Sequence, residues 1–244
     1  TATTSAATDW AVGVAGGWGS VTPDRIRDAA GAPSGMMGRM LSVVDALKGS
    51  RVFTELPAGF PGWMGACEVL LQERLKAWAF AASDLELVSE ALRVFGRRAR
   101  IGVRGARTPE QVRAAVALGA HFVTSPVAYA ELAEAAGDTP IALGALTPNE
   151  IQYALGLGSH TVQVVPGDAL GMSYARTLAD LFADVELLPV GRLEPFQIDM
   201  WRDAGAKAVG LAPAVLFPTL DTHRTGEVDL DALRRRAREF VPAT

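Results

Sequence analysis

Several residue types that mark particular protein classes are rare in this chain of 244 residues. It has one cysteine, Cys67, so no internal disulfide can form and a reducing compartment suits the chain. No apolar run approaches the roughly 18 residues of a membrane span, and residues 1–8 lack the basic start of a signal peptide. The formal net charge of -4 gives no electrostatic reason to expect nucleic acid or anionic lipid as a partner. We therefore expect a soluble, cytoplasmic protein with no nucleic-acid or membrane partner.

Histidine is scarce as well, and its placement argues against a metal site. Of the three histidines, His121 and His160 directly precede apolar runs, and His223 has only Asp221 close to it in sequence. A zinc site needs about four nitrogen, sulfur or oxygen ligands at characteristic spacings. The sequence therefore predicts no metal, and we expect no cofactor.

What the chain does contain is apolar sequence, 49% of all residues, in a regular order. From residue 51 onward, short apolar runs alternate with stretches of helical periodicity. Strands are expected at 52–56 and 77–80, and a helix at 63–73 between them. A hydroxyl side chain followed three places later by an acid or amide predicts a helix start at three places. These are Ser83-Asp84-Leu85-Glu86, Thr108-Pro109-Glu110-Gln111 and Thr147-Pro148-Asn149-Glu150.

The alternation continues to the end of the chain and predicts the fold class. Further strands are expected near Ile101, Phe122, Ile141, Val162, Val185 and Val209. Together with the first two they make eight, which is the number in a parallel (β/α)8 TIM barrel. We predict such a barrel as a single domain over residues 51–244, and an open doubly wound sheet is the alternative.

Residues 1–50 differ in composition and are predicted to be an N-terminal extension. Glycines interrupt any regular period in most of this stretch. A short helix capped by Thr22-Pro23-Asp24 is expected through Ala30, and a second helix from Met36 to Leu47. Glycine and methionine tolerate irregular packing, which favours an extension packed on the floor of the barrel. A lid or a partner surface is the alternative.

The barrel prediction also sorts the polar residues by position. In such barrels the chemistry takes place at the C-terminal ends of the strands, whereas Lys76, Lys207 and two of the histidines fall at strand beginnings. The stretch 161–168 is central, because its β-branched run stops at Pro166 and Gly167 before a helix. The candidate site residues at these strand ends are Glu55, Arg104, Ser125, Thr147, Gln163, Asp168, Arg192 and Gly210.

Several short sequence motifs in the chain occur in the order and spacing of those of a known family. They are Arg107-Thr108-Pro109-Glu110-Gln111, Gly119-Ala120-His121-Phe122-Val123-Thr124-Ser125-Pro126, Val164-Val165-Pro166, Leu188-Pro189-Val190-Gly191 and Ala204-Gly205-Ala206-Lys207-Ala208-Val209-Gly210. From about residue 52 to 241 the chain resembles the 2-keto-3-deoxy-6-phosphogluconate (KDPG) and 4-hydroxy-2-oxoglutarate (KHG) aldolases. The resemblance implies a TIM barrel that forms homotrimers and a class I lyase, in which a lysine on the sixth strand forms a Schiff base with a 2-oxo acid.

The residues that carry that chemistry in the family are replaced here. Gln163 occupies the position of the lysine, and an amide cannot form an iminium; the chain has only three lysines, Lys48, Lys76 and Lys207. The family's glutamate and carboxylate-binding arginine correspond to about Ala77 and Ala81, and its threonines to Gly105 and Val190. Its phosphate cradle corresponds to Gly191-Arg192 and Gly210-Leu211-Ala212. We therefore expect a carboxylate-bearing or apolar ligand to bind better than a phosphorylated sugar acid.

Two hypotheses of different class follow, and a third is kept beside them. In the first, the barrel binds or transforms a small metabolite without Schiff-base chemistry. In this hypothesis the candidate catalytic residues are Gln163, Asp168 and Glu55, and the candidate substrate-binding residues are Arg104, Ser125, Gly191, Arg192 and Gly210. In the second, the chain is a pseudoenzyme, a non-catalytic oligomeric scaffold whose mouth is packed shut. The third is a 2-oxo-acid aldolase that acts by another route. Fold alone does not choose between them.

Overall fold

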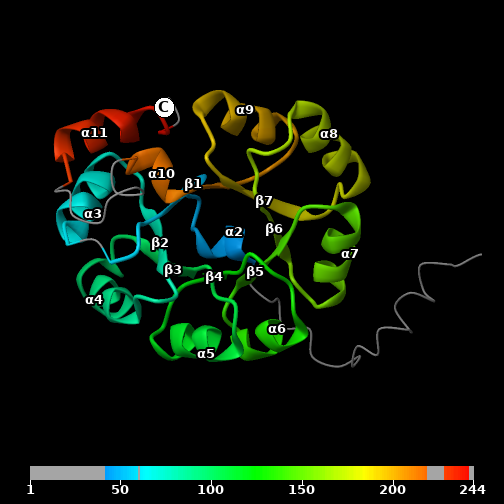
Figure 1. The fold of residues 1–244 in the computed structure, drawn as a ribbon, viewed down its shortest axis with the longest axis horizontal. Coiled ribbons are helices and arrows are strands. Elements are labelled where there is room, and N and C mark those ends of the chain that lie inside the picture. The colour runs from blue at the N-terminus through cyan, green and yellow to red at the C-terminus, as the bar shows by residue number, and fades with distance from the viewer. Residues whose placement is uncertain (1–41, 60, 219–227, 242–244) are drawn as a thin grey trace, which may run out of the picture. The chain divides into compact units, whose positions relative to one another are not determined.

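Eight parallel strands close into a barrel in the order of the chain, as predicted, so the open sheet is excluded (Figure 1). The computed structural model describes residues 42–59, 61–218 and 228–241. Parallel pairing runs from β1 to β8, and β8 pairs back with β1 through Val52 and Val209. The strands are β1 (Val52–Glu55), β2 (Ala77–Ala81), β3 (Arg100–Arg104), β4 (Val123–Thr124), β5 (Ile141–Ala145), β6 (Thr161–Val164), β7 (Glu186–Gly191) and β8 (Val209–Leu211).

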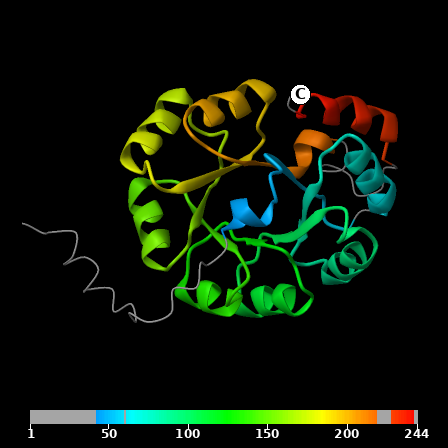
Figure 2. The same ribbon diagram turned by 180° about the vertical axis from the view of Figure 1, so that it is seen from behind.

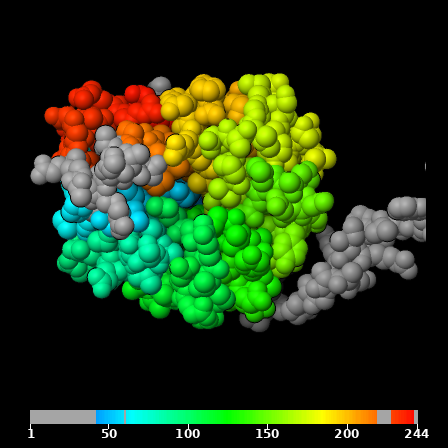
Figure 3. All heavy atoms as spheres, viewed as in Figure 1, coloured from blue at the N-terminus to red at the C-terminus, as the bar shows by residue number. Residues whose placement is uncertain are grey.

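Helices follow the strands and form an outer layer around them (Figure 1), and the space-filling view shows the same segments packed against one another on one face of the molecule (Figure 3). The helices are α2 (Val43–Ala46), α3 (Trp63–Gln72), α4 (Leu85–Phe95), α5 (Pro109–Ala117), α6 (Ala130–Ala136), α7 (Pro148–Gly156), α8 (Met172–Leu181), α9 (Pro195–Asp203), α10 (Pro213–Leu216) and α11 (Leu230–Arg238). Over the described ranges no helix is both long enough and apolar enough to cross a membrane.

Two of the three predicted helix caps form. The hydroxyl groups of Thr108 and Thr147 each accept a hydrogen bond from the backbone amide three residues on. The side chains of Gln111 and Glu150 in turn accept one from the backbone amide of the cap residue. The box predicted at Ser83 was wrong, because α4 takes Asp84 as its N-cap and shows no side-chain capping bond. The Asp84 carboxylate instead accepts a hydrogen bond from the Gly59 amide at 2.7 Å, so a contact between two loops replaces the local cap.

The strands separate two apolar clusters. Outward-facing residues such as Val162 and Val164 pack with the helices. Inward-facing residues such as Phe53 and Leu188 fill the barrel. Because side chains alternate along a strand, Thr161 and Gln163 share the inner face of β6.

The floor of the barrel is closed by α2, which lies inside the ring in both ribbon views (Figures 1 and 2). Val43 and Leu47 are completely buried in the inner cluster. The Val43 amide donates to the hydroxyl of Thr161, and Arg100 Nε donates to the carbonyl of Ala46 at 2.7 Å. Residues 42–47 of the predicted extension therefore pack on the barrel floor, and residues 1–41 lie outside the described residues.

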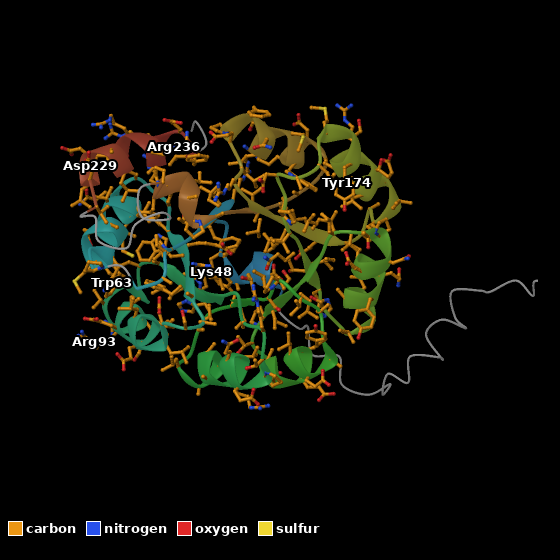
Figure 4. The ribbon with its side chains drawn as sticks, in the orientation of Figure 1. Lys48, Trp63, Arg93, Tyr174, Asp229 and Arg236 are labelled. Atoms are coloured by element: carbon orange, nitrogen blue, oxygen red, sulfur yellow. The ribbon has the colours of Figure 1, made fainter. Side chains whose placement is uncertain are left out.

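Charged side chains tie the last helix to the outer layer. Arg236 on α11 forms a bidentate pair with Glu194 at the start of α9, and Arg238 pairs with Glu73 at the end of α3. Figure 4 labels Arg236 on this outer layer and Lys48 in the middle of the ring, next to α2. The arginines of α11 thus serve as ties between helices.

Candidate functional site

A cavity of about 350 Å³ opens at the C-terminal ends of the strands. Six of the candidate residues line it together: Glu55, Arg104, Gln163, Asp168, Gly191 and Arg192. Arg107, Gly105, Pro126, Val165, Pro166, Val190 and Ala212 complete the described lining, which holds no aromatic side chain. The mouth is therefore an open space lined by charged and amide groups together with small apolar residues.

Glu55 brings a carboxyl group to the cavity from the end of β1. Its side chain is nearly buried, and removal from water raises its pKa from 4.5 to about 7, although the positive charge of Arg104 opposes this. Arg104 is held by Leu56, whose carbonyl accepts bonds from Nε at 3.0 Å and Nη2 at 2.8 Å. Glu55 is therefore close to half protonated at neutral pH, which suits a group that both gives and takes protons.

Gln163 lies on the inner face of β6 with 3% of its surface exposed. Its Oε1 atom is buried and has no hydrogen-bond partner within the part of the chain that the structure describes. A buried amide oxygen without a donor costs about 1–3 kcal/mol. The residue therefore lines the cavity with an acceptor that a ligand hydroxyl or N–H could satisfy.

Asp168, in the loop after β6, and Gly191, at the end of the neighbouring strand β7, meet in the lining. Asp168 Oδ1 accepts a hydrogen bond from the backbone amide of Arg192 at 3.1 Å. A Cβ on Gly191 would lie 2.0 Å from that oxygen, so any other residue there would force the Asp168 side chain to move. Asp168 is a candidate by its place after a strand and Gly191 by the family resemblance, and the structure brings the two residues into contact.

Ser125 and Gly210 are placed away from the cavity lining. The Ser125 hydroxyl donates to the carbonyl of Val127 at 2.8 Å and accepts from its amide, which fixes the turn after β4. Gly210 lies against the ring of Phe53, 2.4 Å from where a Cβ would stand. Their substrate-binding roles stay predictions without a contact to the described cavity. Thr147, the further strand-end candidate, caps α7 instead.

Sequence reasoning missed one charged residue at the mouth. Arg107 lines the cavity from the loop after β3. It stands three places beyond Arg104, and the signal was its position between a strand end and the cap Thr108. In the sequence it belongs to the stretch Arg107-Thr108-Pro109-Glu110-Gln111 that carries the family resemblance, and a guanidinium at this end of a barrel suits the binding of an anion.

The three lysines all stand away from this cavity. Lys76 and Lys207 precede β2 and β8, and Lys48 follows α2 at the floor. Lys207 lies 3.6 Å from Glu186, at the start of β7. Among the described residues, no group of histidine, cysteine, aspartate or glutamate side chains could hold a metal ion.

Comparisons with known proteins agree with the barrel fold. A family described as "KDPG and KHG aldolase" matches residues 86–219, more than half of the chain. The 2-dehydro-3-deoxy-6-phosphogalactonate aldolase of Escherichia coli K12 is 29% identical over 153 residues, which cover 61% of this chain and 70% of the relative.

Two solved structures share the fold. The KDPG aldolase of Legionella pneumophila, with pyruvate captured as a covalent carbinolamine, matches with a TM-score of 0.70 and 18% identity over 81% of this chain and 97% of its own. The KDPG aldolase of Zymomonas mobilis with 3-phosphoglycerate gives a TM-score of 0.70 and 18% identity over 82% and 95%.

Proposed function

Because the chain belongs to the KDPG and KHG aldolase family, we propose that it is a member without the Schiff-base lysine. In this proposal the barrel binds or transforms a small carboxylate-bearing metabolite in the cavity at the strand ends, by noncovalent and proton-transfer chemistry. The observation that carries the proposal is the placement of Gln163 on the wall of that cavity, with all three lysines elsewhere. An amide side chain can orient a carbonyl or hydroxyl group but cannot form an iminium.

The charges of the lining support a carboxylate as the bound group. Arg104 and Arg107 both line the cavity, and a guanidinium holds a carboxylate through charge-assisted, often bidentate hydrogen bonds. Two of the five N–H groups of Arg104 already bond to the carbonyl of Leu56. These bonds fix the guanidinium in place before a ligand arrives, which lowers the entropic cost of binding.

Glu55 supplies the proton-transfer group of the proposed chemistry. With a pKa of about 7 it exists in both forms at neutral pH, and a catalytic acid or base works best when its pKa lies near the working pH. We assign Glu55 to moving a proton at the ligand, Gln163 to orienting a ligand oxygen, and Arg104 to holding a carboxylate.

The same cavity bears on the pseudoenzyme alternative. A scaffold whose old mouth is packed shut would carry bulky side chains there, and the described lining has none that are aromatic. An open, charged cavity favours ligand binding over a purely structural role.

The first experiment separates this proposal from a Schiff-base aldolase. The protein is incubated with pyruvate and sodium borohydride, and its intact mass is measured. We expect no mass increase, because the three lysines stand at strand beginnings or on the floor. The Legionella pneumophila relative, which forms a carbinolamine with pyruvate, is the positive control. A stoichiometric adduct on this chain would overturn the proposal.

The second experiment separates ligand binding from the pseudoenzyme alternative. Pyruvate serves as the carboxylate probe in a calorimetric titration of the full chain. We expect saturable binding that weakens by about tenfold or more in Arg104→Ala, because a charge-assisted contact is lost. Arg113→Ala, which changes an exposed arginine on α5 paired only with Glu110, should bind like the unchanged protein. Absence of saturable binding would favour the pseudoenzyme.

Assembly as a homotrimer is part of the proposal as well. Exposed apolar residues on α8 and α9, such as Leu181 and Phe196, are surfaces that an assembly would cover. Light scattering at micromolar concentration measures the mass directly, and a monomer mass would reject the trimer.

A further inference from the structure

The segment that carries Asp168 is held in one position by its neighbours. Its predecessor Gly167 donates its amide to the carbonyl of Val190 at 2.7 Å and accepts a bond from Trp201 Nε1 at 2.9 Å. Trp201 is fully buried on α9. The backbone before Asp168 is thus fixed between β7 and α9, which directs the carboxylate toward the end of β7.

The carboxylate then occupies a position suited to an anion. Its Oδ1 atom accepts the backbone amide of Arg192 at 3.1 Å. It also stands in the space where any residue other than glycine at 191 would place its Cβ, 2.0 Å away. A backbone amide next to a glycine, where no side chain obstructs approach, is a common arrangement for holding an oxyanion. Here the chain's own carboxylate holds that position.

We propose that Asp168 is a specificity-determining residue. Its carboxylate fills the oxyanion position at the Arg192 amide and thereby excludes phosphate and other external oxyanions from that position, while the ligand carboxylate binds elsewhere in the cavity. An incoming anion would compete for the Arg192 amide and would lie within a few ångströms of a negative charge, which is unfavourable. The ligand group that fits beside Asp168 is instead a neutral hydrogen-bond donor, such as a hydroxyl group. The inference deepens the proposed function, because it concerns the same cavity and the part of the ligand away from its carboxylate.

The proposal predicts that removing Asp168 opens the position. In Asp168→Ala, the Arg192 amide loses its acceptor and the space over Gly191 is freed. We expect inorganic phosphate, titrated at constant ionic strength into the full chain, to bind at least about tenfold more tightly than to the unchanged protein. In a nitrogen–proton NMR spectrum the Arg192 and Gly191 amides should shift on saturation.

Two further variants locate the effect. Asp168→Asn removes the charge but keeps an acceptor oxygen of the same size, so a smaller gain is expected. Gly191→Ala combined with Asp168→Ala places a methyl group in the freed space, and the gained phosphate binding should be lost. If Asp168→Ala fails to fold, the gain in Asp168→Asn alone decides the question.

The proposal is overturned if the unchanged protein binds phosphate as tightly as the variants, or if no folded variant gains phosphate binding. It is also overturned if the gained site shifts other amides and leaves Arg192 unmoved. These outcomes are independent of the pyruvate titration, so a failure here is distinguishable from a failure of the proposed function.

Discussion

Thr161 and Gln163 lie two residues apart on β6 and face the same barrel interior, yet within the described ranges the hydroxyl of Thr161 is hydrogen-bonded and the side-chain oxygen of Gln163 is not. The Thr161 hydroxyl accepts a bond from the Val43 amide at 3.0 Å and donates to Glu186 at 3.2 Å. The buried Oε1 of Gln163 meets no partner among the described residues. Paired polar groups stabilise a core, and unpaired ones cost free energy. The floor of the barrel is therefore built for stability, and the mouth keeps capacity for a ligand.

Burial shifts a titratable group at each end toward its neutral form. At the floor it lowers the pKa of His121 from 6.5 to about 4, helped by Arg100 and Lys48, so the ring stays neutral and its Nδ1 accepts the Ile101 amide. At the mouth it raises the pKa of Glu55 to about 7. Because its pKa is lowered, His121 keeps its hydrogen bond to the Ile101 amide throughout the physiological pH range. Because its pKa is raised, Glu55 gains or loses a proton within that range.

The largest expected effect is the loss of stability when a buried side chain is removed from the barrel floor. Leu47→Ala removes a completely buried side chain next to α2, and we expect it to lower the free energy of unfolding by about 2–5 kcal/mol. Leu181→Ala changes a leucine that is 58% exposed on α8 and should alter it by at most about 0.5 kcal/mol. Urea unfolding measures both. Equal losses would mean that α2 does not anchor the floor.

Glu55→Gln tests the mouth through its pH dependence. Because the folded-state pKa of about 7 exceeds the unfolded value near 4.5, the native state is favoured below about pH 4.5 and loses that advantage as the pH rises through 7. We expect Glu55→Gln to be more stable than the unchanged protein by about 2–3 kcal/mol at pH 8–9 and equally stable at pH 4.

The control for this comparison is Glu134→Gln, which changes an exposed glutamate on α6. Urea unfolding of the three proteins at both pH values isolates the contribution of Glu55. A stability difference that is the same at both pH values would mean that Glu55 is not shifted as described.

Thr161→Val tests whether the paired hydroxyl stabilises the floor. The substitution keeps the shape of the side chain but leaves the Val43 amide without its acceptor and removes a hydrogen bond to Glu186, which keeps Lys207 nearby. We expect the free energy of unfolding to fall by about 1–3 kcal/mol. Thr177→Val, at an exposed position on α8, should change little. A neutral Thr161→Val would indicate that α2 is held by packing alone.

Gln163→Leu is the counterpart at the mouth, with the smallest expected effect on stability. Replacing an unpaired buried amide with an apolar side chain should leave the protein unchanged or more stable by about 1 kcal/mol, because no bond is lost and a desolvation cost is removed. Pyruvate binding should weaken in the same variant. Gln152→Leu on the exposed face of α7 is the control. A clear loss of stability would mean that Gln163 is satisfied in the free protein.

The sequence predicted a helix cap correctly where the cap depends only on residues close to it in the chain. Thr108 and Thr147 cap helices because the groups that they bond lie three residues away. The capping box predicted at Ser83 does not form, and the Asp84 carboxylate accepts a hydrogen bond from the amide of Gly59, which is distant in the sequence. A pattern confined to four residues contains no information about a loop that arrives from another part of the chain.

The site could be predicted to the level of which strand ends take part. Position after an apolar run selected Glu55, Gln163 and Asp168, because all parallel strands of a barrel end at one face. The same rule also selected Ser125, whose hydroxyl is used by the adjacent turn. Strand position does not state which way a side chain turns beyond the last residue of the strand.

By itself the sequence determined the eight-stranded barrel and the face at which its strands end, because hydrophobic periodicity and residue identity are local properties. Only the tertiary structure decided that Gln163 has an unpaired oxygen, that Glu55 has a pKa near 7 and that Asp168 lies over Gly191. These properties depend on water exclusion and on atoms contributed by several strands, and both arise only when the barrel closes.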